Sequence, residues 1–86
     1  MATWRELIED EMKDWGETWA MIESSTITDA QADADFDDGY GVAEGAPFTV
    51  WTERSVYFPI QYDGAEWVGR VSRNPDGVAT PHQGGG

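Results

Sequence analysis

The sequence predicts an α+β domain in which N-terminal helices pack on a three-stranded antiparallel β-meander. Two observations lead to this prediction. Apolar residues recur at helical spacing near the N-terminus, whereas residues 48–72 are rich in β-branched and aromatic side chains and contain two short turns. With 86 residues, 40% of them apolar, the chain has material for one modest core. We therefore expect a single domain over residues 1–73 and a flexible tail over residues 74–86, where NPDGVATPHQGGG is typical of a loose end.

The first expected element is a helix from about Trp4 to Trp15. Thr3 precedes it as a capping residue, and Glu6 occupies the capping-box position three residues later. Gly16 provides a left-handed stop. One apolar stripe follows from the spacing of Trp4, Leu7, Ile8, Met12 and Trp15.

A second helical region is expected before the sheet. Residues 17–23 favour a short helical turn that packs inward, and residues 24–27 favour extended backbone. Thr28 then caps a helix from about Asp29 to Phe36, with Gln31 at its capping-box position. Residues 37–47 contain three glycines among acids and predict a loop.

The back half predicts strands over residues 48–52, 55–62 and 65–72. Asp63-Gly64 is a strong hairpin signal and favours a two-residue type I′ turn. That turn sets the pairing of the last two strands and places eight mostly apolar residues on one face, which we expect to receive the helices. The four pairs are Tyr62 with Ala65, Ile60 with Trp67, Phe58 with Gly69, and Val56 with Val71.

Two further expectations concern the aromatic residues and proline of the strands. A tight turn at Glu53-Arg54 would place Trp51 and Tyr57 on opposite faces, so that one of them is available to a partner. Pro59 cannot donate to a strand ladder, which predicts a bulge or an unpaired edge there. The remaining tryptophans are expected in the core: Trp4, Trp15, Trp19 and Trp67.

The charge distribution is the main functional clue. The chain has 17 acidic and five basic residues, for a net charge of −12. Residues 1–46 hold 13 of the acids against Arg5 and Lys13 alone, for a net charge of −11, and the remaining residues net −1. Such acidity disfavours direct binding to nucleic acid or to an anionic membrane and favours a cationic partner. Cysteine is absent, which excludes disulfides and thiolate metal sites, and the acidic N-terminus predicts neither a secretory signal nor a transmembrane helix.

Three acids recur every fourth residue on the first helix: Glu6, Asp10 and Asp14. One interpretation is a phosphate mimic that occupies the basic groove of a nucleic-acid-binding protein. The alternative is a solvated acidic face kept for solubility or adaptation to high salt. The near-neutral back half favours mimicry, because adaptation to salt acidifies a whole surface. The residues predicted to bind the partner are Glu6, Glu9, Asp10, Asp14, Asp33, Asp35, Asp37 and Asp38.

The other chemical motifs are weak. Asp33, Asp35, Asp37 and Glu44 have the spacing of an EF-hand calcium loop, but Asp38 stands where the loop needs glycine, and a strand follows instead of a helix. We therefore expect these acids to join the acidic surface, and we expect no cofactor or metal. The single histidine, His82, lies in the predicted tail, where no general base is held in place, so we expect no enzyme.

One segment carries a family resemblance. Residues 48–75, FTVWTERSVYFPIQYDGAEWVGRVSRNP, resemble a group of small acidic proteins encoded by bacteriophages and prophages, and the preceding DDGYG and PF match the same pattern. The resemblance implies a phage protein acting in the bacterial host cytoplasm. By analogy at the level of class, it implies an inhibitor that imitates nucleic acid, as anti-CRISPR and anti-restriction proteins do.

The expected partner is thus a host nucleic-acid-binding protein with a basic groove, such as a CRISPR effector or a restriction-type enzyme. The acidic chain would block that groove as a monomer or a small homo-oligomer. The alternative function is a phage structural or assembly accessory protein that binds through its aromatic sheet.

Overall fold

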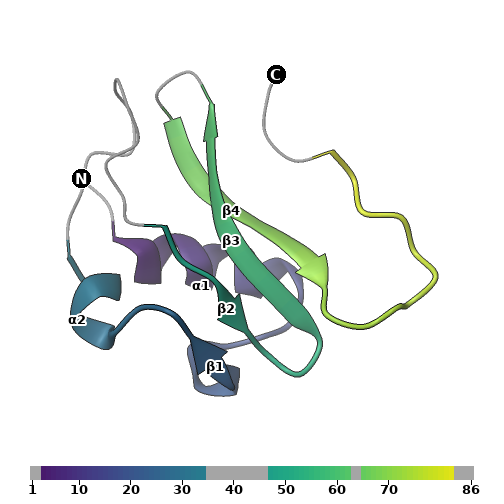
Figure 1. Cartoon of the computed structure of the whole chain (residues 1–86), viewed down its shortest axis with the longest axis horizontal. Coiled ribbons are helices and arrows are strands. Elements are labelled where there is room, and N and C mark those ends of the chain that lie inside the picture. The colour runs from purple at the N-terminus through teal and green to yellow at the C-terminus, as the bar shows by residue number, and fades with distance from the viewer. Residues whose placement is uncertain (1–2, 35–46, 63–64, 83–86) are drawn as a thin grey trace.

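The computed structural model describes residues 3–34, 47–62 and 65–82. It has two layers, with helix α1 behind an antiparallel sheet in the view of Figure 1. The sheet order is β1-β2-β3-β4, and β3 and β4 are its long strands. The α+β class is therefore confirmed. The elements are α1 (Trp4–Asp14), the 3₁₀ helix η1 (Trp19–Met21), β1 (Ser24–Ser25), α2 (Asp29–Ala32), β2 (Val50–Trp51), β3 (Ser55–Tyr62) and β4 (Ala65–Ser72).

The described part of the sheet has four strands, so the expected number of three was wrong. Ser24 pairs with Trp51, and Ser25 pairs with Val50, which adds β1 to the outer side of β2. The sequence predicted extended backbone here but gave no sign of pairing, because two exposed serines show no apolar alternation. The predicted strand over residues 48–52 is shortened to Val50–Trp51.

Helix α1 forms largely as the sequence predicts. The Thr3 hydroxyl accepts a hydrogen bond from the Glu6 amide at 3.1 Å, and Gly16 ends the helix with a φ of +68°. The core side of the helix is formed by Trp4, Ile8 and Met12, each at most 2% exposed.

Trp15 does not belong to the core, contrary to the prediction, because its side chain is 43% exposed. Its indole Nε1 donates to Glu11 at 3.0 Å, and its ring lies 4.0 Å from the guanidinium of Arg70. An indole so engaged is stable at the surface, since it keeps both a hydrogen-bond partner and a cation over its ring. Trp19 and Trp67 are half-buried, so only Trp4 meets the expectation in full.

Helix α2 begins as predicted and ends early. Thr28 and Gln31 form both hydrogen bonds of the capping box, at 2.9 and 3.1 Å. The helix ends at Ala32 instead of Phe36. Acids accumulate at that end, where the helix dipole is unfavourable to negative charge. Residues 35–46, which include most of the predicted loop, lie outside the described residues.

The pairing of β3 with β4 matches the prediction at every position, from Tyr62 opposite Ala65 to Val56 opposite Val71. Pro59 lies opposite Val68 in unbroken register, so the predicted bulge is absent. The alternative, an unpaired edge, is found on the other side of Pro59, because the described pairing of β2 with β3 includes only Val56 and Tyr57. The backbone amide of Thr52 donates to the Ser55 carbonyl, so the odd-numbered residues of β3 direct their backbone groups toward β2. The backbone amide of Arg73 donates to the Arg54 carbonyl, so the even-numbered residues direct theirs toward β4. Pro59 therefore needs no donor for the β3–β4 ladder.

The sheet face that receives the helix is the opposite of the predicted one. Tyr57 is fully buried and Val68 is 3% exposed, and both belong to the core together with α1. The predicted face, with Val56, Phe58 and Trp67, is mostly half-buried. Strand alternation favoured the predicted face, because the covered face of the hairpin has only Tyr57, Pro59 and Val68 as apolar residues among polar and charged ones. The core consists of Trp4, Ile8, Met12, Phe48, Val50, Tyr57 and Val68.

Two observations complete the fold. Residues 74–82 form no helix or strand and extend beyond the β4 side of the sheet (Figure 1). In the described part of the chain, no helix has the length and apolar content needed to cross a bilayer.

The choice of sheet face can be tested with a matched pair of substitutions in β4. Val68→Ala is expected to lower the free energy of unfolding by about 2 kcal/mol, because it removes buried methyl groups and leaves a cavity. Val71→Ala removes the same atoms from the half-buried face and should cost about 1 kcal/mol or less. Denaturant unfolding of both variants measures the difference. Equal losses would contradict the assignment of the core face.

Candidate partner-binding surface

The outer side of α1 carries a row of carboxylates. Glu6, Asp10 and Asp14 are exposed, and they lie four residues apart on the side away from Trp4, Ile8 and Met12. Successive members are separated by about 6 Å along the helix axis. We call these three residues the α1 acidic row. The row follows directly from amphipathicity, because burying the apolar stripe leaves the acids in solvent.

Arg5 links one flank of α1 to α2. Its guanidinium lies 3.5 Å from the Glu9 carboxylate and 3.7 Å from that of Asp33, and it also lies 4.9 Å from the ring centre of Trp19. The structure thus brings together Glu9 and Asp33, two of the predicted binding residues that are distant in sequence. Their charge is partly compensated, which the sequence did not indicate.

The acidic row is also partly compensated. Lys13 Nζ lies 3.6 Å from Asp10 Oδ1, with both side chains more than 70% exposed. An ion pair this exposed contributes only about 0–1 kcal/mol and exchanges readily with solvent ions. Within the described residues, Glu6 and Asp14 have no ion-pair partner. Two predicted residues of the row therefore present uncompensated carboxylates.

The remaining predicted binding residues are Asp35, Asp37 and Asp38, and they lie outside the described residues together with Glu44. The calcium-loop spacing is therefore not visible in the structure. Among the residues that are described, no group of three histidine or acidic side chains is arranged to hold a metal ion.

The far side of the sheet from α1 has no charged side chains in its described strands. Its residues alternate with those of the core and form what we call the open sheet face. No helix lies in front of β3 and β4 in Figure 1, where α1 passes behind them. Ile60 is 8% exposed, and the other members are half-buried. The open sheet face comprises Trp51, Val56, Phe58, Ile60, Trp67 and Val71.

Sequence reasoning missed a buried carboxylate at the end of α1. Glu17 is 5% exposed, and its two oxygens accept hydrogen bonds from the Tyr57 hydroxyl at 2.5 Å and from the Thr52 hydroxyl at 2.7 Å. Arg54 Nε lies 3.8 Å from the same carboxylate. The sequence contains no signal for this contact, because it joins residues 35 to 40 positions apart.

This environment shifts the titration of both partners. Burial raises the pKa of Glu17, but hydrogen bonds from Tyr57, Ser55 and Thr52, together with the charge of Arg54, outweigh it and hold the pKa below the usual 4.5. Burial and the hydrogen bond to Glu17 raise the pKa of the Tyr57 phenol far above its ordinary value. At neutral pH the pair is thus an ionised acceptor and a neutral donor, which is a structural arrangement and does not favour proton transfer.

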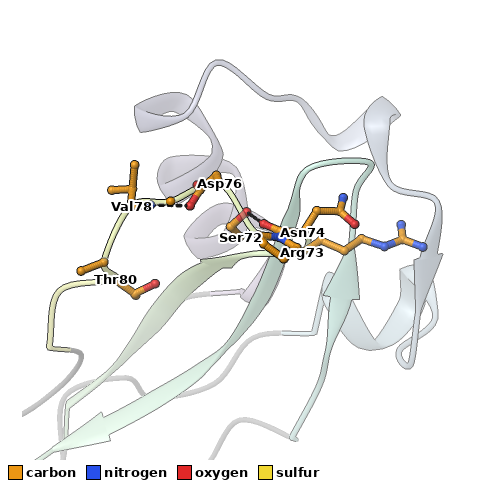
Figure 2. A pocket seen from close by; sticks show the side chains of 9 residues that line it. Ser72, Arg73, Asn74, Asp76, Val78 and Thr80 are labelled. Carbon is orange, nitrogen blue, oxygen red and sulfur yellow. Dashed lines mark hydrogen bonds between the residues drawn. The ribbon is translucent and has the colours of Figure 1, made fainter.

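The cavities of the described structure do not bring reactive side chains together. An open hollow of about 570 Å³ is lined by residues 72–80, in the bend after β4. Figure 2 shows Arg73 and Asn74 extending to one side of this bend and Val78 to the other, so no reactive groups converge. Asp76 is occupied in accepting a hydrogen bond from the Val78 amide at 3.0 Å. A second cavity, of about 350 Å³, lies beside Glu17 and Arg54.

Comparison with protein-family models, with curated proteins and with solved structures found no match for this chain.

The role of Glu17 predicts a pH-dependent loss of stability on substitution. Glu17→Gln should lower the free energy of unfolding at neutral pH, because a neutral amide replaces a carboxylate that accepts buried hydrogen bonds. The pKa of Glu17 is lower in the folded than in the unfolded state, so its stabilising effect is present above the unfolded pKa and is lost as pH falls through the folded pKa.

The measurement is chemical unfolding of both proteins across a pH series. We expect a constant difference between about pH 8 and about pH 6 that shrinks once the pH falls below the usual 4.5 of a glutamate. Glu53→Gln, an exposed substitution on the adjacent turn, is the matched control and should leave the profile unchanged. A difference that is independent of pH would argue against an ionised buried Glu17.

Proposed function

We propose that this chain is a stoichiometric inhibitor whose acidic α1 surface occupies the basic groove of a nucleic-acid-binding host protein. The expected class is a CRISPR effector or a restriction-type enzyme, with the chain encoded by a phage and acting in the host cytoplasm. One observation carries the proposal. Charge is segregated between the two layers, with the carboxylates of α1 on one side of the molecule and the uncharged open sheet face on the other.

The charge count supports this segregation. Residues 3–34 hold nine carboxylates against Arg5 and Lys13, for a net charge of −7. In residues 47–62 and 65–82 there are three acids and three arginines, which cancel. A surface that concentrates one sign of charge steers a cationic partner and raises the rate of encounter. Adaptation to high salt predicts acids over both parts, and the described residues do not show that pattern.

The spacing of the α1 acidic row is compatible with phosphate mimicry. Its members are separated by about 6 Å, whereas phosphates follow one another at about 3.4 Å of rise along each strand of a duplex. Each carboxylate of the row would therefore correspond to roughly every second phosphate. Glu9 and Asp33 lie beside the row, and their exposed pairing to Arg5 leaves room for exchange with a partner's lysine or arginine.

A second candidate function rests on the open sheet face. Its aromatic members Trp51, Phe58 and Trp67 are half-buried, uncharged and not covered by a described helix. Large rigid aromatic residues are common anchors of protein interfaces. This face favours the alternative of a phage structural or assembly accessory protein that binds through its sheet.

Salt dependence separates the two functions. Inhibition through the acidic surface should weaken steeply between about 50 and about 500 mM NaCl, because screening shortens the range of charge attraction. Binding through the open sheet face should change little over that range. The assay is displacement of labelled duplex DNA from purified CRISPR effectors and restriction enzymes, measured by fluorescence anisotropy at each salt concentration.

The α1 acidic row can be tested by neutralising its three members. The triple variant Glu6→Gln, Asp10→Asn and Asp14→Asn should displace DNA about tenfold or more less effectively than the wild type at low salt, because loss of close interfacial charge pairs typically costs at least about 1.5 kcal/mol. The matched control removes three exposed acids elsewhere: Asp29→Asn, Glu53→Gln and Asp76→Asn. Both variants lose the same net charge, so equal weakening would mean that total charge matters and the row does not.

A further inference from the structure

We propose that the cleft between the end of α1 and the segment after β4 binds a protonated amine on a short aliphatic stem, either a free alkylamine or a lysine side chain. The cleft has a volume of about 380 Å³, at the lower end of the range for small-ligand sites, about 300–1,000 Å³. Amine binding at this cleft is independent of the proposed function. The lining residues that matter for it are Glu11, Trp15, Arg70, Asp76, Val78 and Ala79.

The walls of the cleft bring exposed apolar side chains together. Trp15 is 43% exposed and Val78 is 74% exposed, and they are two of the three large hydrophobic residues that the described part of the chain leaves exposed. Single apolar residues at a surface need no explanation. Two from distant segments that line one cleft, with Ala79 beside them, instead provide a wall for an aliphatic stem.

Local hydrogen bonds hold the segment that forms one wall (Figure 2). The Ser72 hydroxyl donates to the Asn74 carbonyl at 2.5 Å, and the Val78 amide donates to Asp76 Oδ1 at 3.0 Å. Gly77 adopts a φ of +76°, a conformation that favours glycine. The turn that presents Val78 to the cleft is therefore encoded in its own sequence.

Two carboxylates of the lining use only one oxygen each. Glu11 Oε2 accepts a hydrogen bond from the indole Nε1 of Trp15 at 3.0 Å, and Asp76 Oδ1 accepts the bond from Val78. Neither carboxylate forms an ion pair with another described residue, so the second oxygen of each is left for a cation. The C-terminal end of α1 adds to the attraction, because this end of a helix carries partial negative charge.

The arginine in the lining is already engaged. Arg70 Nε donates to the Ser55 hydroxyl at 2.8 Å, and its Nη2 donates to the Arg54 carbonyl at 3.3 Å. Its guanidinium also lies 4.0 Å from the centre of the Trp15 ring. Arg70 does not form an ion pair with either acid. The two acids and one arginine among the described lining residues leave the cleft with a net charge of −1.

These contacts favour an ammonium group over a guanidinium. A guanidinium binds best as a planar fork on both oxygens of a carboxylate, or stacked on an aromatic ring. Here one oxygen of each carboxylate is engaged, and Arg70 already lies over the Trp15 ring. An ammonium is a compact charge with three donors, so it can bind the remaining oxygens of Glu11 and Asp76 while its stem lies against the apolar wall.

Titration of the unmodified chain with n-butylamine, followed by proton–nitrogen correlation NMR, tests the inference. n-Butylammonium is the lysine side chain without its backbone, and n-butanol is the neutral control with the same stem. The amine should shift the Trp15 indole and the Val78 and Ala79 amides saturably, with a millimolar dissociation constant. The indole of Trp4, which is 2% exposed, should not shift. n-Butanol should bind at least about fivefold more weakly, because it forms no ion pairs. Equal affinities for amine and alcohol, or an amine titration that does not saturate, would overturn the inference.

N-acetyl-lysine methylamide distinguishes the two sources of the amine. An affinity equal to that of n-butylamine assigns the cleft to a lysine side chain of another protein. Binding of n-butylamine alone assigns it to a free alkylamine.

The role of the carboxylates is tested by Glu11→Gln combined with Asp76→Asn. Each amide oxygen can still accept the local hydrogen bond, so the cleft keeps its shape. This double variant should bind n-butylamine about fivefold or more weakly than the wild type, since both ion pairs are lost. The matched control, Glu53→Gln with Asp29→Asn, removes the same charge outside the cleft and should bind within about twofold of the wild type, because distant exposed charges are screened.

Equal affinity of the two double variants would overturn the inference, because the carboxylates of the cleft would then contribute nothing specific. If the cleft variant does not fold, the comparison of n-butylamine with n-butanol on the unmodified chain decides.

Discussion

The packing of α1 on the Tyr57 side of the sheet is the contact on which the other features depend. Trp4, Ile8 and Met12 are buried against this side, so the acids of the helix face solvent and the opposite side of the sheet is left without a helical cover. A phenol at the centre of a small core needs a partner for its hydroxyl, because an unpaired buried polar group costs about 1–3 kcal/mol. Glu17 supplies that partner from the segment after the helix. The Glu17 carboxylate thereby stabilises the arrangement in which the Tyr57 side of the sheet faces the core.

The same contact explains how a strongly acidic chain holds a compact shape. The exposed carboxylates of α1 stand on the outer side of that helix, away from the core. Arg5 and Lys13 lie among them on α1, where each forms an ion pair with a neighbouring acid. The other three cations lie in the sheet or next to it and bond to backbone carbonyls, to Ser55 or to single carboxylates: Arg54, Arg70 and Arg73. The cations thus form contacts that stabilise the fold, and Glu6 and Asp14 have no ion-pair partner among the described residues.

Local signals predicted much of this fold. The capping residues, the stop at Gly16 and the register set by Asp63-Gly64 all depend on residues a few positions apart. The covered face of the sheet did not follow from the sequence, because strand alternation favours the other, more apolar face of the hairpin, and the contact from Glu17 to Tyr57 spans 40 positions. For the same reason the exposure of Trp15 was not predicted, since it depends on Arg70 from the last strand. Of the candidate site, the acidic row followed from helical periodicity, and the bridging role of Arg5 did not.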